Sequence, residues 1–130
     1  MKDITREWLE DAEYDIRSAE AMYDSGRYFF VVFMCHLAIE KMLKALWIEE
    51  KGDLPPKVHN LVYLMKATSV KFPEEYLQLI SDINDKNVIT RYPDGRKLLA
   101  ETLTQEGVKL TLVKTKELWE WLKQNRILKN

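Results

Sequence analysis

The chain has 130 residues, of which 46% are hydrophobic and 32% are charged. This composition indicates one soluble globular domain over residues 1–130 and excludes a disordered chain. The 20 Lys and Arg residues are balanced by 21 Asp and Glu residues, so no overall basic field marks a nucleic-acid binder. The longest apolar run is too short to span a membrane, and the first residues carry no signal-peptide pattern. A cytoplasmic protein is therefore expected.

Asp3 or Thr5 is predicted to cap a first helix, which is expected to end near Ser25 and Gly26. Its apolar side chains recur every three or four residues, which is the spacing of one buried helix face; they are Trp8, Ala12, Ile16, Ala19 and Tyr23.

Asp15 lies on this helix close to the buried face, so its carboxylate needs a partner. Lys41, Lys44 or Arg91 could supply the positive charge. Two interpretations stay open, namely an ion pair that ties two helices together and part of a ligand site.

The stretch from Tyr28 to Trp47 is predicted to be the central helix. Its first eight residues are apolar without a break, which indicates burial on all sides. His36, Glu40 and Lys44 follow at steps of four, which places them in a polar stripe along one helix face. Because the link to the first helix is short, the two helices are expected to pack antiparallel.

Cysteine and histidine are too scarce for a zinc site built from them, because the chain has one Cys and two His. No metal or other cofactor is expected, and no phosphate-binding glycine loop occurs. Cys35 lies in the most apolar run and is predicted to be a small buried hydrophobe. His36 could act as a general base or be a hydrogen-bonded histidine of the core or of an interface.

The second half of the chain predicts further helices. A glycine and two adjacent prolines in residues 51–57 end the central helix. A short helix is predicted from about His59 to Thr68, and another is predicted to begin at Pro73. Residues 84–95 are polar and turn-rich and are expected to form a loop. A last amphipathic helix is predicted from Val108, after a start signal at residues 104–107. The expected fold is all-α, an up-and-down four-helix bundle with one or two additional short helices.

Several motifs occur in a characteristic order. Residues 8–19 are followed by GRYFFVVFMCHLAIEKMLKAL at 26–46, by VHNL at 58–61 and by RYP at 91–93. In this order the chain resembles the HEPN domain family over nearly its whole length, most strongly in AIEKMLKAL. The resemblance implies a compact helical bundle similar to the C-terminal domain of kanamycin nucleotidyltransferase. It also implies frequent dimers and a small nucleotidyltransferase partner, as in toxin-antitoxin-type pairs.

Two activities are attached to that family, nucleotide binding and metal-independent RNA cleavage in a subset. The subset carries an Arg followed by four to six residues and then a His. No His follows Arg91 in this sequence, and eight residues separate Arg27 from His36. The ribonuclease motif is therefore absent from the sequence, and the resemblance implies binding more than cleavage.

The candidate ligand-binding residues are Asp15, Lys41, Lys44, Arg91 and Tyr92, with His36 and Glu40 in support. A lysine could neutralise a phosphate while the guanidinium binds it through two hydrogen bonds and the tyrosine stacks on a base. Structural alternatives stay open. Glu40 and Lys44 could form an ordinary pair within one helix, and Arg91 could cap the preceding helix.

The first functional hypothesis is a non-catalytic HEPN module that binds a nucleotide or phosphate-bearing ligand, as a homodimer and with a nucleotidyltransferase partner. A ribonuclease toxin, in which Arg91 works with a substitute for the missing His, is an alternative; RNA is therefore a less favoured ligand. A purely structural dimerisation or docking subunit is a third. Trp47, Trp119 and Trp121 exceed what one small core needs, which is typical of an interface.

Overall fold

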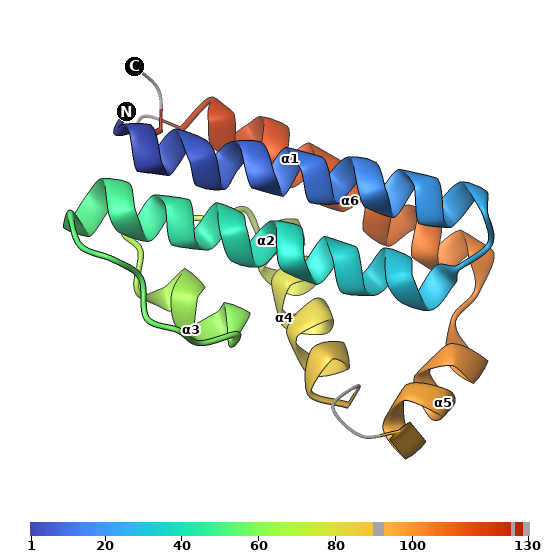
Figure 1. Ribbon diagram of the computed structural model, residues 1–130. Helices are drawn as coiled ribbons and strands as arrows, with labels where there is room; N and C mark the ends of the chain where they lie inside the picture. Colours follow the sequence, from blue (N-terminus) through green and yellow to red (C-terminus); the bar gives the residue numbers. More distant parts are fainter. Residues whose placement is uncertain (90–92, 126, 129–130) are drawn as a thin grey trace.

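The computed structural model describes residues 1–89, 93–125 and 127–128, and this part of the chain contains only helices and their connections (Figure 1). The predicted all-α helical bundle is confirmed. The helices are α1 (Asp3–Asp24), α2 (Tyr28–Lys51), α3 (Leu61–Lys66), α4 (Glu74–Ile89), α5 (Pro93–Thr102) and α6 (Gln105–Lys123). Among the described residues, no helix is both long and apolar enough to cross a membrane.

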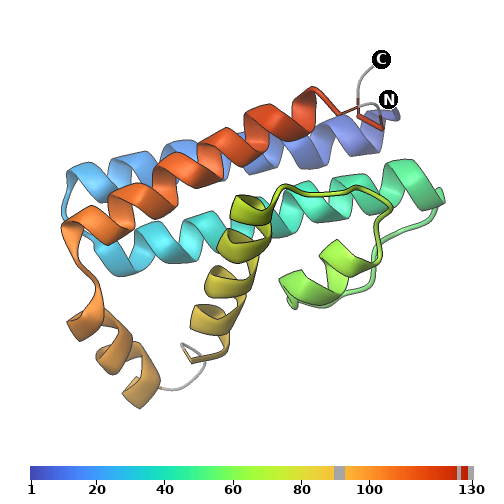
Figure 2. The ribbon, with the colours of Figure 1, turned by 180° about the vertical axis from the view of Figure 1, so that it is seen from behind.

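The helices α1, α2 and α6 lie side by side and form the body of the molecule (Figure 1). The predicted cap of α1 at Asp3 or Thr5 is wrong, because the N-cap is Lys2 and no side chain makes a capping hydrogen bond there. The helices α1 and α2 run antiparallel, as expected, through a tight turn in which Gly26 has a φ of 77°. Such a positive φ suits glycine because it has no Cβ. Seen from behind, α6 lies in front of the other two long helices, and α4 slants away from them (Figure 2).

The central position of α2 follows from its sequence. Its apolar side chains face neighbours on several sides, and most are fully buried; examples are Val31, Cys35, Ile39, Met42 and Leu46. Burial raises the pKa of the Cys35 thiol to about 11, against the opposing effect of a hydrogen bond with Thr115. The prediction that Cys35 is a buried hydrophobe is confirmed.

The connection after α2 is held by Trp47. Its indole Nε1 donates a hydrogen bond to Asp53 Oδ1 at 3.0 Å, and its ring stacks on Tyr63 with 6.4 Å between the ring centroids. Asn60 caps α3, because its Oδ1 accepts from the Tyr63 backbone N–H at 3.0 Å. The short helix predicted in this region is confirmed, although it begins at Leu61.

The loop predicted over residues 84–95 is wrong where the structure describes it. Helix α4 continues to Ile89, and α5 begins at Pro93. Asn84 is a poor helix former, but its Oδ1 accepts a hydrogen bond from the Leu61 backbone N–H at 2.8 Å. This tertiary contact outweighs the local propensity. A proline in first position followed by Asp94 is a helix start that the sequence analysis overlooked.

Helix α6 closes the bundle. Thr104 is its N-cap, because Thr104 Oγ1 accepts from the Gly107 backbone N–H at 3.0 Å. The helix therefore begins at Gln105, three residues before the predicted start. The Trp121 ring packs on Phe72 and Tyr76, with centroids 5.6 and 5.7 Å away. All three tryptophans assigned to an interface are partly buried against the core.

Candidate ligand-binding site

Ionisable side chains gather around the middle of α2, on the side that α1 and the loop before α3 cover. We call this group the buried ionic array and define it as Asp15, His36, Glu40, Lys41, Lys44 and His59. Four of them are buried, which is unusual for ionisable residue types; they are Asp15, His36, Glu40 and Lys44. His36, Glu40 and Lys44 share one face of α2, as their spacing predicts.

Glu40 is the centre of the array. Its Oε2 lies 3.1 Å from Lys44 Nζ, and His59 Nδ1 lies 3.0 Å from Oε1 and 3.2 Å from Oε2. His36 Nδ1 is farther away, at 3.9 Å from Oε1. The ammonium group of Lys44 also lies 5.8 Å from the centroid of the Trp8 ring. The Glu40 carboxylate is thus surrounded by one ammonium group and two imidazoles.

A second ion pair joins α1 to α2. Lys41 Nζ lies 2.8 Å from Asp15 Oδ2, and the Lys41 side chain keeps 25% of its exposure. Of the three partners that the sequence offered to Asp15, the described structure uses Lys41. Both lysines of the predicted ligand site are therefore neutralised by carboxylates of the same array.

Arg91 and Tyr92 lie outside the described residues. The helix before them, α4, reaches the array with its C-terminal part, because Lys86 and Asn87 line a small cavity together with His36. Phe29, Phe33 and Leu99 line the other walls of this cavity, so α2, α4 and α5 meet beside His36.

His59 is a member of the array that the sequence analysis did not include. It comes from the loop before α3, and 64% of its side chain is exposed, so it forms the outer edge of the array. Its one signal in the sequence was its place in the VHNL segment, because its spacing from Glu40 follows no local periodicity. The described residues contain no group of three His, Cys, Asp or Glu side chains that could hold a metal ion.

The array has a definite chemical capacity. It contains two carboxylates and two ammonium groups, so its formal charge is balanced, and its two imidazoles add nitrogen atoms that can donate or accept hydrogen bonds. An anion could be accommodated if it replaced a carboxylate beside a lysine or if it bound at the imidazole edge. The fold and the array together define a helical-bundle domain with an ionisable centre.

The family follows from a comparison of sequences. The model of the HEPN domain matches residues 5–125, which is nearly the whole chain, so the chain belongs to the HEPN domain family. The resemblance predicted from the motifs is thereby confirmed.

A comparison with solved structures agrees on the fold. The chain is similar to TT1696 from Thermus thermophilus, with a TM-score of 0.79 and 21% sequence identity. The similarity covers 95% of this chain and 98% of that protein. At this identity the likeness shows the fold alone. A comparison with curated protein sequences found no significant match.

Proposed function

We propose that this chain is a non-catalytic HEPN module that binds a nucleotide or another phosphate-bearing ligand in the cytoplasm. It acts with a nucleotidyltransferase partner, as in toxin-antitoxin-type pairs. The observation that carries the proposal is the buried ionic array. Its ligand-binding residues are Asp15, Lys41 and Lys44, with His36 and Glu40 in support.

The presence of the array supports a binding function, because buried ion pairs contribute little to the stability of a fold. Desolvating two charges costs several kcal/mol per ion, and replacing a buried ion pair by apolar side chains is often neutral or stabilising by about 1–4 kcal/mol. A domain of 130 residues that needed only a core could fill the space around Glu40 with leucine. Buried ionisable groups of this kind cluster at functional sites.

The ligand would enter at the partly exposed members of the array, which are Lys41 and His59. Lys41 is partly exposed, so a phosphate could take this ammonium group from Asp15, and the exposed imidazole of His59 could donate a hydrogen bond to the phosphate. Arg91 and Tyr92 follow α4, whose end meets His36. We assign to them the guanidinium contact to phosphate and the stacking on a base.

A homodimer is the proposed assembly, and a docking function through the same surface is the second candidate. The observation that favours it is a pair of exposed apolar side chains about one turn apart on α2, Phe30 and Phe33. Phe29 and Phe30 also line a hollow of about 390 Å³ beside α5. Exposed apolar side chains that lie together are typical of protein interfaces.

A thermal-melt screen against nucleoside mono-, di- and triphosphates tests the binding function. A ligand that binds only the folded state raises the free energy of unfolding by about 2.7 kcal/mol at a hundred times its Kd. We expect a shift with at least one nucleotide, reduced in Lys41→Gln and Arg91→Ala and retained in Lys97→Gln, a control on α5. No shift with any nucleotide would contradict the proposal.

An RNA-cleavage assay on the same protein sample distinguishes the binding module from the ribonuclease alternative. We expect total RNA to stay intact in magnesium and in EDTA, because the Arg and His spacing of the ribonuclease subset is absent from the sequence. Degradation that disappears in Arg91→Ala would favour the ribonuclease toxin instead.

A further inference from the structure

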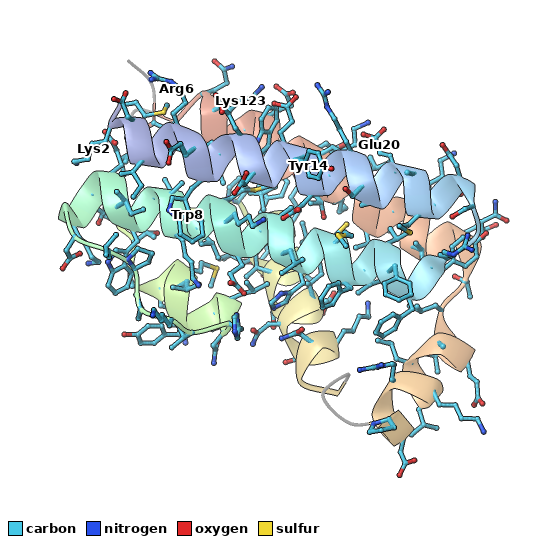
Figure 3. All side chains as sticks on the ribbon, in the orientation of Figure 1. Lys2, Arg6, Trp8, Tyr14, Glu20 and Lys123 are labelled. Carbon is cyan, nitrogen blue, oxygen red and sulfur yellow. The ribbon has the colours of Figure 1, made fainter. Side chains whose placement is uncertain are left out.

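A groove runs along the side of α1 that faces α6, away from the buried ionic array. Figure 3 shows Arg6, Glu20 and Lys123 along this edge, whereas Trp8 lies on the flank of α1 toward α2. The larger hollow of the groove has a volume of about 580 Å³, and its floor is apolar; it is formed by Ile16, Tyr76, Val113 and Trp119. This volume is in the range of ligand-binding pockets.

The groove is elongated. A second hollow of about 400 Å³ continues it toward Arg6 and Leu128, and the two hollows share Glu13 and Trp119. From Arg6 to Glu20, α1 rises by roughly 21 Å at about 1.5 Å per residue. An extended peptide of about six residues has this length. The dimensions of the groove therefore suit a peptide segment better than a compact small molecule.

Trp119 lies where the two hollows meet, and its indole N–H has no acceptor. The Nε1 atom is shielded from solvent and makes no hydrogen bond with the described residues. The ring is covered by Lys123, whose Nζ lies 3.5 Å from the ring centroid. A buried donor without an acceptor is unfavourable. A main-chain carbonyl of a bound peptide would satisfy it if the Lys123 side chain, which covers the ring, moved aside and opened the N–H to the groove.

The rim of the larger hollow is acidic. Four glutamates line it together with Arg17 and Lys116. Arg17 lies 2.7 Å from Glu13, and Lys116 lies 3.2 Å from Glu20, so both cations are already paired.

Two further glutamates of this rim lie on α6. Glu120 pairs with Lys123 at 3.3 Å, whereas Glu117 makes no ion pair with any described residue. The pKa of the nearby Tyr76 hydroxyl is raised, first by burial and then by the charges of Glu75 and Glu117. Among the four glutamates of this rim, Glu117 is therefore the one left to pair with a cation of a ligand.

We propose that the α1–α6 groove binds an extended basic peptide segment of a partner protein. A carbonyl of the segment accepts from Trp119, an apolar side chain packs on Ile16 and Val113, and a lysine or arginine pairs with Glu117. The segment is extended because the carbonyls of a helix are already bonded within the helix. This docking site does not depend on the phosphate site proposed above.

Selection of random hexapeptides displayed on phage, followed by fluorescence anisotropy with the best labelled peptide, tests the proposal. We expect the selected peptides to be basic. Glu117→Lys should weaken binding about tenfold. Trp119→Phe, which keeps the ring and removes the donor, should weaken it about fivefold. Glu101→Lys on α5 and Trp47→Phe are the matched controls, and neither should change the Kd. Circular dichroism checks that each variant is folded.

Three outcomes would overturn this assignment. In the first, no peptide is enriched over a selection against the double variant Glu117→Lys, Trp119→Phe. In the second, the selected peptides are acidic, or they bind both variants as well as the original chain. In the third, Glu117→Lys halves the mass measured by light scattering, which would make the groove an interface between two copies of this chain.

Discussion

Two ion pairs of this protein have nearly the same distance between nitrogen and oxygen and very different surroundings. Lys44 Nζ lies 3.1 Å from Glu40 in the buried ionic array, and Lys116 Nζ lies 3.2 Å from Glu20 beside the α1–α6 groove. The side chains of the first pair are 7% and 8% exposed, and those of the second are 49% and 43% exposed. Coulomb attraction is strong where water is excluded and weak where water screens it. Distance alone therefore does not rank the two pairs.

The comparison separates two roles for charge in this fold. Removing one member of the buried pair leaves the other charge in the core without its ion-pair partner. The exposed pair can separate at little cost, because water solvates both partners. The array is thus a fixed part of the bundle, and the pairs on the groove can rearrange when a partner binds.

Lys44→Ala should destabilise the protein more than any other substitution proposed for this comparison. It leaves the Glu40 carboxylate buried without its ammonium partner, and we expect a loss of about 3–5 kcal/mol in the free energy of unfolding. Urea denaturation followed by circular dichroism measures it. The double variant Glu40→Leu, Lys44→Met removes both charges and should recover most of the loss. If the double variant is as unstable as Lys44→Ala, lost packing of the lysine stem, and not the unpaired charge, is the cause.

Glu49 is partly buried, so replacing it should lower the free energy of unfolding by an intermediate amount. Its Oε1 accepts from the Lys2 backbone N–H and from Thr5 Oγ1, each at 2.9 Å, and 15% of its side chain is exposed. The hydrogen bond from Lys2 is the main cause that lowers the pKa of Glu49 below its ordinary value of 4.5. Its contribution is therefore complete above pH 4.5 and is lost as the pH falls through the lower folded pKa.

Glu49→Gln should lower the free energy of unfolding by about 1 kcal/mol at neutral pH. Urea titrations at a series of pH values should show a smaller decline below pH 4.5 than in the original chain. Equal acid sensitivity in both proteins would contradict a stabilising role of the ionised carboxylate.

Replacing the exposed pair of Glu20 and Lys116 should change the free energy of unfolding least. A double-mutant cycle of Glu20→Ala and Lys116→Ala should yield a coupling free energy of about 0–1 kcal/mol, which decreases as salt is added. A salt-independent coupling as large as that of the buried pair would remove the contrast between the two environments.

The sequence predicted well what depends on local periodicity. The buried face of α1 follows from apolar residues that recur every three or four positions, and the burial of α2 follows from its unbroken apolar run. The shared face of His36, Glu40 and Lys44 also follows from spacing. These features depend on neighbours a few residues away, and helix geometry fixes where those neighbours lie.

What the sequence could not give depends on contacts between distant segments. Asn84 stays helical because Leu61 donates to it, and His59 joins the array across 19 residues. The acidic groove requires α1 and α6 to be side by side, although Glu20 and Lys116 are 96 residues apart. The roles of Arg91 and Tyr92 stay predictions.

The tight turn at Gly26 also affects how fast the chain can fold. The most extensive helix contact in the molecule joins α1 and α2, which are neighbours in the chain. Loop closure between such segments costs little entropy, and chains rich in local contacts fold fast. The two helices that carry the array can therefore pair before α6, the last helix of the chain, arrives to form the second wall of the groove. We therefore expect the α1–α6 groove to form late in folding, after the core on which it rests.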